Sequence, residues 1–325
     1  MATIADIADA AGVSKSTVSR AFTRPDSVNT ETRERILAVA AQLGYTAAPA
    51  KAEATGTVAL FIPDIANPYY PPLVKAVQTA CQRQSLSLIV IDGEDDPEAD
   101  AKELERIIGR VDGALVFAPR LDAARLRALD VVAPVVLINH VAEGLPSVIL
   151  SAPEGARQAV EHLAALGHRT IAYLASREDN YSSRVRLAAA EEAADHLGVT
   201  LRVLTHSEPT YTAGVRGGDL VLAEPVTAVI AHNDLMAFGC MNRLIDRGVA
   251  VGKEISVVGF DDIWLSSASR PTLTTVSTPY ERGGAVALRM LTERIGDPDR
   301  PVSTVHLSGD LVVRNSTGPA PAQLD

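Results

Sequence analysis

The chain has 325 residues, enough for two or three domains, and 47% of them are hydrophobic, which excludes a disordered protein. One Trp, seven Tyr and five Phe are too few for the aromatic platforms that bind single-stranded nucleic acid. A formal net charge of −10, taken alone, also disfavours a nucleic-acid partner.

Cysteine use and the amino-terminal composition predict the compartment. Cys81 and Cys240 are too few for a disulfide framework and lack the neighbours of a metal site, so we expect buried thiols in a reducing cytosol and neither a metal nor a cofactor. The chain begins without a basic leader and contains no apolar run of about 20 residues, the length that spans a bilayer. The sequence therefore predicts a soluble, cytoplasmic protein.

The composition changes near residue 46. Residues 1–45 contain short helical patterns, residues 46–56 are rich in alanine, and strands and helices alternate from Thr57 onward. This order predicts a helical headpiece over 1–45, a linker over 46–56 and a large α/β body over 57–325. The body is expected to form two lobes, about 57–148 with 279–303 and about 149–278 with 304–318.

The first 45 residues have the spacing of a helix-turn-helix. A first helix ends at Gly12, Ser14 is placed to cap a second helix through Phe22, and Asn29 is placed to cap a third. The apolar positions that share a face in the first and third helices are Ile4, Ile7, Ala8, Ala11, Ile36, Val39, Ala40 and Leu43. Three short helices around one small core are predicted.

Five sequence segments distinguish a DNA-binding domain from a generic three-helix cap. They are Thr3–Ala8, Ala11–Ser14, Thr17–Arg20, Thr32–Ile36 and Leu43–Tyr45. Together they resemble, without gaps, the headpiece of the LacI (lac repressor) family of transcriptional regulators. The resemblance implies that the helix from Ser14 lies in the major groove of operator DNA. It also implies base reading by Lys15, Ser16 and Arg20, and phosphate bonding or helix capping by Thr17, Ser19, Asn29 and Thr32.

The charge divides unevenly along the chain. Five basic and five acidic residues cancel within 1–45, so the whole excess of −10 belongs to the remainder. The positive groups of the headpiece gather on the second predicted helix and at the start of the third. DNA affinity is therefore expected to depend on a few contacts and on pairing two headpieces in a homodimer.

The linker departs from the family pattern. Relatives carry a Pro-Asn pair and then a leucine that wedges into the minor groove, whereas Ala54 stands near the place of that leucine here. Pro49 can open a short helix over 50–54, or the segment can be a flexible tether. Since alanine cannot unstack a base step, we expect a smaller operator bend than in relatives with the leucine.

The body contains nine strand-like runs with helical patterns between most of them. The runs are Thr57–Ile62, Leu86–Ile91, Ala114–Phe117, Val135–Ile138, Ser147–Leu150, Thr170–Leu174, Thr200–Leu204, Thr227–Ala231 and Ile255–Gly259. The helical patterns include Leu73–Gln84, Asp100–Gly109, Gly155–Leu166, Arg186–Leu197 and Leu235–Gly248. This alternation indicates an α/β fold with doubly wound parallel sheets in two lobes, whose ligands bind beyond the carboxyl ends of the strands.

Polar residues follow several of these strands, while catalytic motifs are missing. No GxGxxG follows a strand, and HExxH and GxSxG are absent, so we expect no enzyme. Asn233 and Asp261 come at strand ends, and Arg186 lies in the helix after Thr170–Leu174. Separate helix caps and surface charges are the alternative, but a shared location at one side of two sheets favours convergence on a cleft.

Further strings resemble the effector domain of the same family, which is similar to periplasmic sugar-binding proteins. They are Pro63–Tyr70, Val160–Arg169, Asn233–Gly239, Ile255–Asp262 and Pro271–Val276. The resemblance implies that an effector is bonded by Arg186, Asn233 and Asp261, with ring faces from Tyr69, Tyr70 and Tyr211. These groups suit vicinal hydroxyls, so a sugar or nucleoside is the leading class. The pairs Ser151-Ala152 and Ala189-Ala190 depart from the family pattern, so the effector's identity does not carry over.

The predicted function is that of a sequence-specific DNA-binding repressor, controlled by a small effector and without a membrane partner. Two alternatives come from other classes. A solute-binding receptor would have no use for residues 1–45, and a sugar- or nucleoside-processing enzyme would need a base or nucleophile in the cleft.

Overall fold

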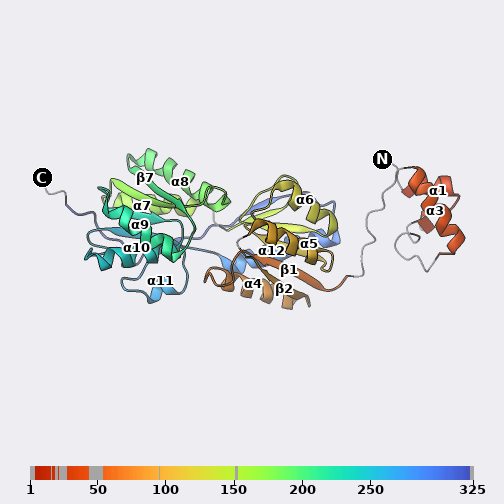
Figure 1. Ribbon diagram of the computed structural model, residues 1–325, viewed down its shortest axis with the longest axis horizontal. Coiled ribbons are helices and arrows are strands. Elements are labelled where there is room, and N and C mark those ends of the chain that lie inside the picture. Colours follow the sequence, from red (N-terminus) through yellow and green to blue (C-terminus); the bar gives the residue numbers. More distant parts are fainter. Residues whose placement is uncertain are drawn as a thin grey trace. The chain divides into compact units, whose positions relative to one another are not determined.

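The computed structural model describes residues 4–15, 17–18, 21, 28–43, 54–94, 96–150 and 153–322. The chain divides into two compact units, Met1–Thr55 and Gly56–Asp325, each of which is drawn in Figure 1. Several features singled out above lie outside the described residues. They are Ser16, Ser19, Arg20, residues 46–53 of the linker and the Ser151-Ala152 pair.

The first unit has the predicted helix starts. It contains α1 (Ile4–Ala11) and α3 (Thr30–Gln42), with helical backbone between them at Lys15, Thr17 and Val18. The Ser14 Oγ accepts a hydrogen bond from the Thr17 backbone N–H at 3.1 Å, as expected of a cap. Asn29 caps α3, because its Oδ1 accepts from the Glu31 backbone N–H at 2.9 Å.

One small core holds this unit together. Its buried members are Ile7, Ala8, Ala11, Val18, Ala21, Ile36 and Ala40. Leu43, predicted to share the stripe of the third helix, is instead 42% exposed. It follows the last residue of α3, beyond the turn that packs against α1.

The second unit is built on two six-stranded sheets, as the α/β pattern predicts. The first sheet has the order β11-β5-β4-β3-β1-β2 and is parallel throughout. Its strands are β1 (Thr57–Ile62), β2 (Ser87–Asp92), β3 (Gly113–Phe117), β4 (Val135–Ile138), β5 (Ser147–Ile149) and β11 (Thr304–His306). We call the part of the chain built on this sheet the first lobe.

The second sheet has the order β12-β10-β9-β8-β6-β7, in which β12 alone is antiparallel to its neighbour. Its strands are β6 (Thr170–Ser176), β7 (Thr200–Ser207), β8 (Ala228–Ala231), β9 (Ser256–Asp261), β10 (Thr274–Ser277) and β12 (Leu311–Val312). The part built on this sheet is the second lobe. All nine predicted strands are present, whereas β10, β11 and β12 were not predicted as strands, because β10 and β11 consist mostly of Thr, Ser and His and β12 has only two residues.

The chain passes between the lobes more than once. The first lobe takes β1 to β5 and later β11, and the second lobe takes β6 to β10 and β12. Residues 304–306, expected in the second lobe, therefore belong to the first, since β11 pairs with β5.

Helices cover both faces of each sheet (Figure 1). They are α4 (Tyr70–Arg83), α5 (Pro97–Ile108), α6 (Ala123–Val132), α7 (Pro153–Ala165), α8 (Tyr181–Leu197), α9 (Tyr211–Leu222), α10 (Asp234–Asp246), α11 (Leu265–Ala268) and α12 (Tyr280–Gly296). Five of these match the predicted patterns, whereas α6, α9, α11 and α12 were not predicted. The three glycines of α9 weaken its helical signal, but Gly214 and Gly218 allow it to lie against α10, and Gly217 allows it to lie against Leu174 of β6.

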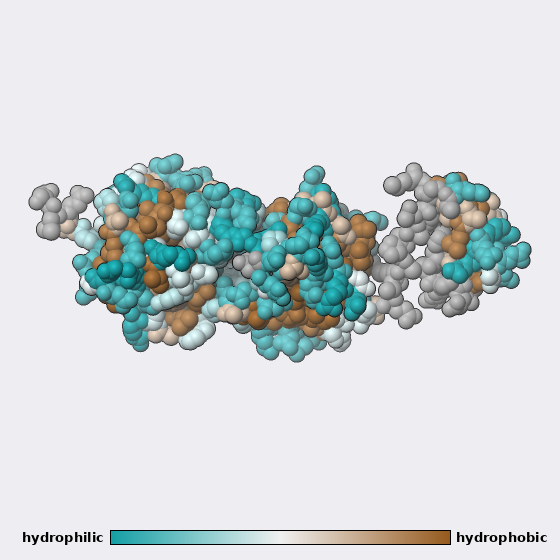
Figure 2. Space-filling model, in the orientation of Figure 1, coloured by the Kyte–Doolittle hydropathy of each residue, from teal (hydrophilic) through white to brown (hydrophobic). Residues whose placement is uncertain are grey.

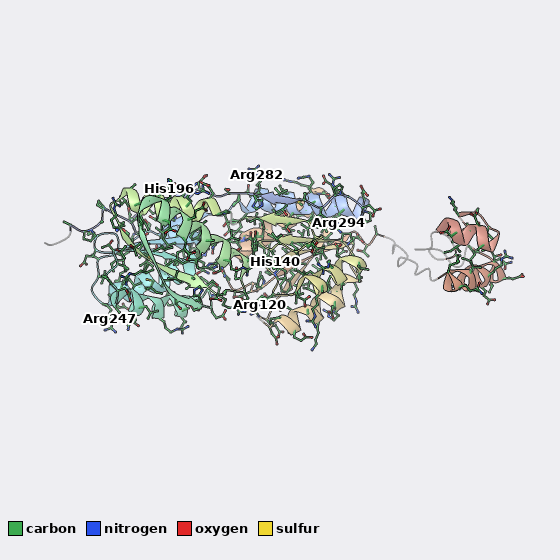
Figure 3. All side chains as sticks on the ribbon, turned by 90° about the horizontal axis from the view of Figure 1, so that it is seen from above. Arg120, His140, His196, Arg247, Arg282 and Arg294 are labelled. Carbon is green, nitrogen blue, oxygen red and sulfur yellow. The ribbon has the colours of Figure 1, made fainter. Side chains whose placement is uncertain are left out.

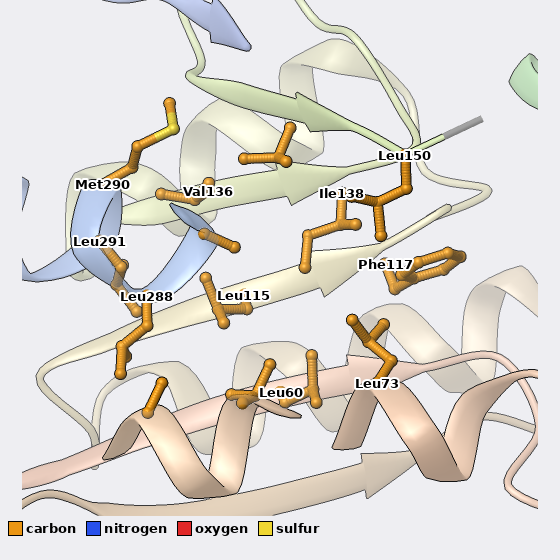
Figure 4. Packing of buried hydrophobic residues seen from close by; sticks show 14 of the residues in the cluster. Leu60, Leu73, Leu115, Phe117, Val136, Ile138, Leu150, Leu288, Met290 and Leu291 are labelled. Carbon is orange, nitrogen blue, oxygen red and sulfur yellow. The ribbon is translucent and has the colours of Figure 1, made fainter. Parts of the chain in front are cut away.

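Alternate residues of the central strands face opposite helix layers. In β1, Val58, Leu60 and Ile62 join the cluster that contains Leu73 of α4 and Leu288 of α12 (Figure 4). Ala59 and Phe61 join a second cluster with α5 and α6. In β6, likewise, Ile171 and Tyr173 face α7 and α8, while Ala172 and Leu174 face α9 and α10. Each fully buried Leu or Ile contributes about 1.5–3 kcal/mol, and this packing fixes the strand ends that carry the site.

The surface outside these clusters is mixed. In the face of the second unit seen in Figure 2, hydrophilic residues predominate and apolar residues form separate patches. Val131 and Trp264 are the most exposed large apolar side chains among the described residues, at 75% and 68%.

Candidate functional site

Three strand ends in the second unit have a backbone conformation that is rare outside glycine. The φ angles are 39° at Ala118 after β3, 51° at Asn139 after β4 and 111° at Asp261, the last residue of β9. Such positions are costly and persist only where the surroundings hold them. All three residues line one cavity between the lobes, which we call the inner cavity. Its walls also include Tyr69, Tyr70, Asn180, Arg186, Pro209, His232 and Asn233.

Arg186 and Asp261 form a buried pair in this cavity. The Arg186 Nη2 lies 3.5 Å from the Asp261 Oδ1, and the two side chains are 5% and 8% exposed. The Arg186 Cζ lies 4.5 Å from the centroid of the Phe260 ring. Burial raises the pKa of Asp261 to about 7, although the Arg186 charge opposes that rise. The pair offers a fork of donors beside a carboxylate, the geometry that vicinal hydroxyls match.

α8 places Arg186 at this point. The helix begins after Asn180, whose Oδ1 accepts a hydrogen bond from the Ser183 backbone N–H at 3.2 Å. Arg186 lies less than two turns farther on and is 4% exposed. Arg184, on another side of the same turn, donates to the Glu178 carbonyl oxygen at 2.8 Å in an exposed setting.

Asn233 and Asp234 have different structural roles. Asn233 caps α10 by accepting from the Met236 backbone N–H at 2.9 Å, and its Nδ2 donates to the Pro209 carbonyl at 3.0 Å. Asp234 is fully buried and accepts from the Ser266 hydroxyl at 2.7 Å and the Ile263 backbone N–H at 3.0 Å. Asn233 lines the inner cavity, whereas Asp234 braces the strand end behind it.

Aromatic rings close the first-lobe side of the cavity. Tyr69 packs edge-on against Tyr70, Phe117 and Tyr280, with ring centroids 5.1, 5.6 and 5.3 Å apart. The Tyr69 hydroxyl accepts from the Asn139 Nδ2 at 3.3 Å. The Tyr280 hydroxyl donates to the Asp261 carbonyl oxygen at 3.1 Å and so links the two lobes. Burial raises the pKa of Tyr69, which keeps its hydroxyl protonated.

The structure brings five of the six predicted effector residues together and leaves one apart. Tyr69, Tyr70, Arg186, Asn233 and Asp261 all line the inner cavity. Tyr211 does not, because its side chain is 43% exposed and its hydroxyl accepts from the Asn242 Nδ2 at 2.8 Å.

Asn139 and His232 also line the inner cavity, although neither was predicted as a site residue. Both follow a buried strand directly, β4 for Asn139 and β8 for His232, which is the signal that identified Asn233. Asn139 also accepts from the Leu150 backbone N–H at 2.7 Å. Applying the strand-end rule to every parallel strand would have found both residues.

A second cavity adjoins the first, and we call it the outer cavity. The two share Tyr70, Ala118, Asn180 and Pro209 as walls. Arg120 and His140 of the first lobe, labelled in Figure 3, line the outer cavity together with groups of the second lobe. The second-lobe groups include Ser176, Arg177, Asp179, Tyr181 and Glu208. Arg177 lies 2.7 Å from Asp179 and 2.9 Å from Glu208, so its charge is compensated.

In the first unit the structure describes four of the seven predicted DNA-contact residues. Lys15 and Asn29 are exposed, and Thr17 and Thr32 are half-buried. The Thr17 hydroxyl lies 2.7 Å from the Ser14 hydroxyl, so both belong to the helix cap. Asn29 likewise acts as a cap, one of the two roles expected for it.

The described ranges contain neither a metal-binding cluster nor a membrane-spanning helix. No group of three His, Cys, Asp or Glu side chains there is arranged to hold a metal ion. Among the helices of those same ranges, none combines the length and apolar character needed to cross a membrane.

Known families match both units. Residues 3–47 match the family described as bacterial regulatory proteins, lacI family, and residues 160–317 match the periplasmic binding protein-like domain. The HTH-type transcriptional regulator MalR of Streptomyces coelicolor is 30% identical over 98% of this chain and 98% of its own. The HTH-type transcriptional repressor PurR of Haemophilus influenzae is 30% identical over 97% of this chain and 98% of its own.

Two solved structures with similar folds contain bound ligands, cellobiose in one and operator DNA with an anti-inducer in the other. The transcriptional regulator CelR in complex with cellobiose has a TM-score of 0.73 and 28% identity, and the match covers 97% of this chain and 100% of that one. The lac repressor dimer bound to operator and the anti-inducer ONPF has a TM-score of 0.72 and 28% identity, covering 98% and 99%. Since such relatives align over nearly the whole of both chains, this chain belongs to the lacI family of bacterial regulatory proteins.

Proposed function

We propose that this regulator is a cytoplasmic, homodimeric repressor, without enzymatic activity, whose operator binding is set by a sugar or nucleoside held between its two lobes. The observation that carries the proposal is the buried pair of Arg186 and Asp261, 3.5 Å apart, in a cavity whose other wall comes from the first lobe. A ligand that bonds this pair and Asn139 touches both lobes at once. It therefore favours one arrangement of the lobes over others.

Differential affinity is what converts this contact into regulation. The effector can shift DNA occupancy only if it binds the DNA-competent and DNA-incompetent arrangements unequally. Arg186, Asn233 and Asp261 from the second lobe, and Tyr69, Tyr70 and Asn139 from the first, are the proposed effector contacts. Tyr211 is left out of this set, since its ring lies away from the cavity.

The DNA contacts are proposed for the first unit. Lys15, Ser16 and Arg20 would read base edges from the second helix, with Thr17, Ser19, Asn29 and Thr32 at the phosphates or at helix caps. Two headpieces of a dimer would occupy successive half-sites of a near-palindromic operator. The relative whose structure is a dimer on its operator supports this arrangement.

Binding without turnover is supported by the pairing of the cavity's acid. Asp261 is held beside Arg186, and Tyr280 bonds its backbone carbonyl rather than its carboxylate. The named relatives are regulators and repressors.

A two-stage experiment tests the proposal. Duplexes selected from a random pool by the full-length protein would supply the operator, and a thermal-shift panel of sugars and nucleosides would supply the effector. A ligand of the folded state raises the melting temperature by mass action, and it should also change retention on the selected duplex. Product analysis after incubation should recover the ligand unchanged. Failure of the whole panel to alter either melting or DNA retention would contradict effector control, and conversion of the ligand would favour an enzyme.

A further inference from the structure

Two consecutive residues at the end of β9 have positive φ angles, although neither is a glycine. The φ angle is 111° at Asp261 and 52° at Asp262. An aspartate tolerates the left-handed region, which spans φ values of about 50–70°, but 111° lies well beyond it. Asp261 is nevertheless the residue that faces Arg186 in the inner cavity. Contacts with other elements must therefore hold this segment in a shape that its own backbone does not favour.

The backbone on either side of Asp262 is fixed by other elements. The Tyr280 hydroxyl donates a hydrogen bond to the Asp261 carbonyl oxygen at 3.1 Å. The Ile263 backbone N–H donates to a buried carboxylate of α10 at 3.0 Å. The Asp262 backbone N–H lies 3.4 Å from the hydroxyl of Thr275. Of these three bonds the longest is thus the one at Asp262, directly after the strained residue.

The side chain of Asp262 makes a much shorter contact with the C-terminal part of the chain. The Arg314 Nη2 lies 2.6 Å from the Asp262 Oδ1, and the two side chains are 18% and 25% exposed. Arg314 is itself fixed, because its Nη1 donates to the Leu273 carbonyl oxygen at 2.8 Å and its backbone N–H donates to the Thr274 hydroxyl at 2.9 Å. Since a change of φ at Asp261 also moves the next residue, this pair opposes relaxation of the strained backbone.

The contacts of Tyr280 and Arg314 come from segments that join the two lobes. Tyr280 begins α12 of the first lobe, shortly after β10 of the second. Arg314 follows β12 of the second lobe, which the chain reaches directly from β11 of the first. The two joining segments bond each other, since the Ser277 backbone N–H donates to the Asp310 carbonyl oxygen at 2.9 Å. The strained end of β9 is therefore held at the place where the lobes are connected.

We propose that Arg314 is a positioning residue for effector binding, which acts through Asp262 to hold Asp261 in its strained conformation. In that conformation the Asp261 carboxylate lies beside Arg186 in the inner cavity. Arg314 lines neither cavity, so it acts without touching the effector. The inference rests on the proposed function, in which Asp261 is an effector contact. It also gives the joining segments a part in regulation, because a movement of one lobe against the other alters the contacts that hold Asp261.

Hydrogen exchange of the free, full-length protein tests the hold on the backbone. Arg314→Ala should raise exchange in peptides that cover residues 260–264 by about tenfold, whereas Arg314→Lys, which keeps a charged donor, should stay closer to the unchanged protein. Arg294→Ala is the matched control. The Arg294 Nη2 also lies 2.6 Å from an aspartate, Asp130, but this pair is in the first lobe. Its loss should leave exchange over residues 260–264 unchanged.

Calorimetric titration tests the effect on the effector site, with ribose, cellobiose, cytidine and adenosine as probes. A probe that binds the unchanged protein should bind Arg314→Ala about tenfold more weakly and Arg294→Ala within about twofold, because only the first variant releases Asp261. Asp262→Asn keeps a residue that tolerates positive φ but removes the charge, so it should weaken binding by a smaller factor. The double variant should be no worse than Arg314→Ala alone, because both changes act on one pair.

The outcomes separate this inference from the proposed function. Unchanged exchange over residues 260–264 in Arg314→Ala, or an equal loss of binding in Arg314→Ala and Arg294→Ala, would overturn the positioning role and leave effector control standing. If melting curves show that Arg314→Ala does not fold, Asp262→Asn decides, and exchange and affinity equal to those of the unchanged protein in that variant would overturn the role. If no probe binds the unchanged protein, the inference fails together with the proposed function.

Discussion

The Arg186 Nη1 donates a hydrogen bond of 2.6 Å to the carbonyl oxygen of His232, so an arginine in α8 fixes the residue that directly follows β8. The other end of the same guanidinium lies 3.5 Å from Asp261, at the end of β9. One side chain thereby holds two neighbouring strand ends, and it sets the spacing between Asn233 and Asp261 as well as offering its own donors to a ligand.

Replacing Arg186 should therefore damage both stability and effector response. Arg186→Ala leaves the Asp261 carboxyl buried without its partner, a loss of about 3 kcal/mol in the free energy of unfolding. Urea denaturation and a ligand titration would measure the two effects. Arg184→Ala, two residues earlier and bonded to the exposed Glu178 carbonyl, is the control and should change stability by less than about 0.5 kcal/mol. Equal behaviour of the two variants would show that Arg186 does not organise the strand ends.

Effector affinity should rise with pH through neutrality. Burial raises the pKa of Asp261 from 3.8 to about 7, against the pull of Arg186. An ionised carboxylate accepts two hydroxyls whereas the acid accepts fewer, so binding should tighten by up to about tenfold between pH 6 and pH 8, following the ionised fraction. Tyr69 and Tyr280 stay neutral in that window, because burial raises their pKa values. Asp261→Asn should bind more weakly and show a flat profile in calorimetric titrations. A profile that is flat in the unchanged protein would contradict this role.

The stability of the free protein should move in the opposite direction. The pKa of Asp261 is higher in the folded chain than its ordinary value of 3.8, so the folded state holds the proton more tightly. The contribution of this group to stability is thus complete below about pH 3.8 and is lost as pH rises through about 7. Burial also raises the pKa of Asp234, which adds to the same trend. Melting temperatures of Asp261→Asn should decline less over this range than those of the unchanged protein, and parallel curves would rule Asp261 out as the source.

The contact of α9 with α10 depends on glycine. A Cβ on Gly239 would stand 2.0 Å from the Tyr211 carbonyl oxygen, and one on Gly214 would stand 2.1 Å from that of Met236. Gly239→Ala should therefore force the helices apart and cost about 1–3 kcal/mol, measured by chemical denaturation. Gly296→Ala is the control, since nothing lies within 4 Å of its added Cβ, and it should be neutral or slightly stabilising. A neutral Gly239→Ala would mean that the helices can separate without loss.

The fold was largely predictable from the sequence, because long buried strands and regular helices carry their own periodicity. The helix α9 was not predicted, because it contains three glycines that serve its close packing. Its glycines lower helix propensity, and the close packing that offsets this cost is made with α10 and with Leu174 of β6, both outside the local sequence. β10 to β12 were not predicted because β10 and β11 are mostly Thr, Ser and His and β12 has only two residues, so none of them shows an apolar run.

The cavity was predictable to a similar extent. Asn233 and Asp261 each follow or end a parallel strand of the same sheet. They were expected to lie close together, because the carboxyl ends of parallel strands meet at one edge of a sheet. Tyr211 shows the limit of that logic. It begins α9 after β7, but a hydrogen bond with Asn242 of the packed helix α10 turns its side chain away from the cavity. A side-chain direction set by a tertiary contact has no signal in local sequence.

Arg20 of the first unit is the residue proposed to read a guanine. Arg20 lies outside the described residues, so its assignment rests on the family resemblance that the matched residues 3–47 support. An arginine bidentate to guanine O6 and N7 is worth about 1–3 kcal/mol, so Arg20→Ala should weaken operator binding by that amount and relax discrimination at one base position. Arg35→Ala, an exposed arginine of α3, is the control, because a phosphate contact there would weaken all sequences equally. Binding to a library of single-base operator variants distinguishes the two. If Arg20→Ala weakens every variant by the same factor, Arg20 contacts the backbone and the base-reading assignment is lost.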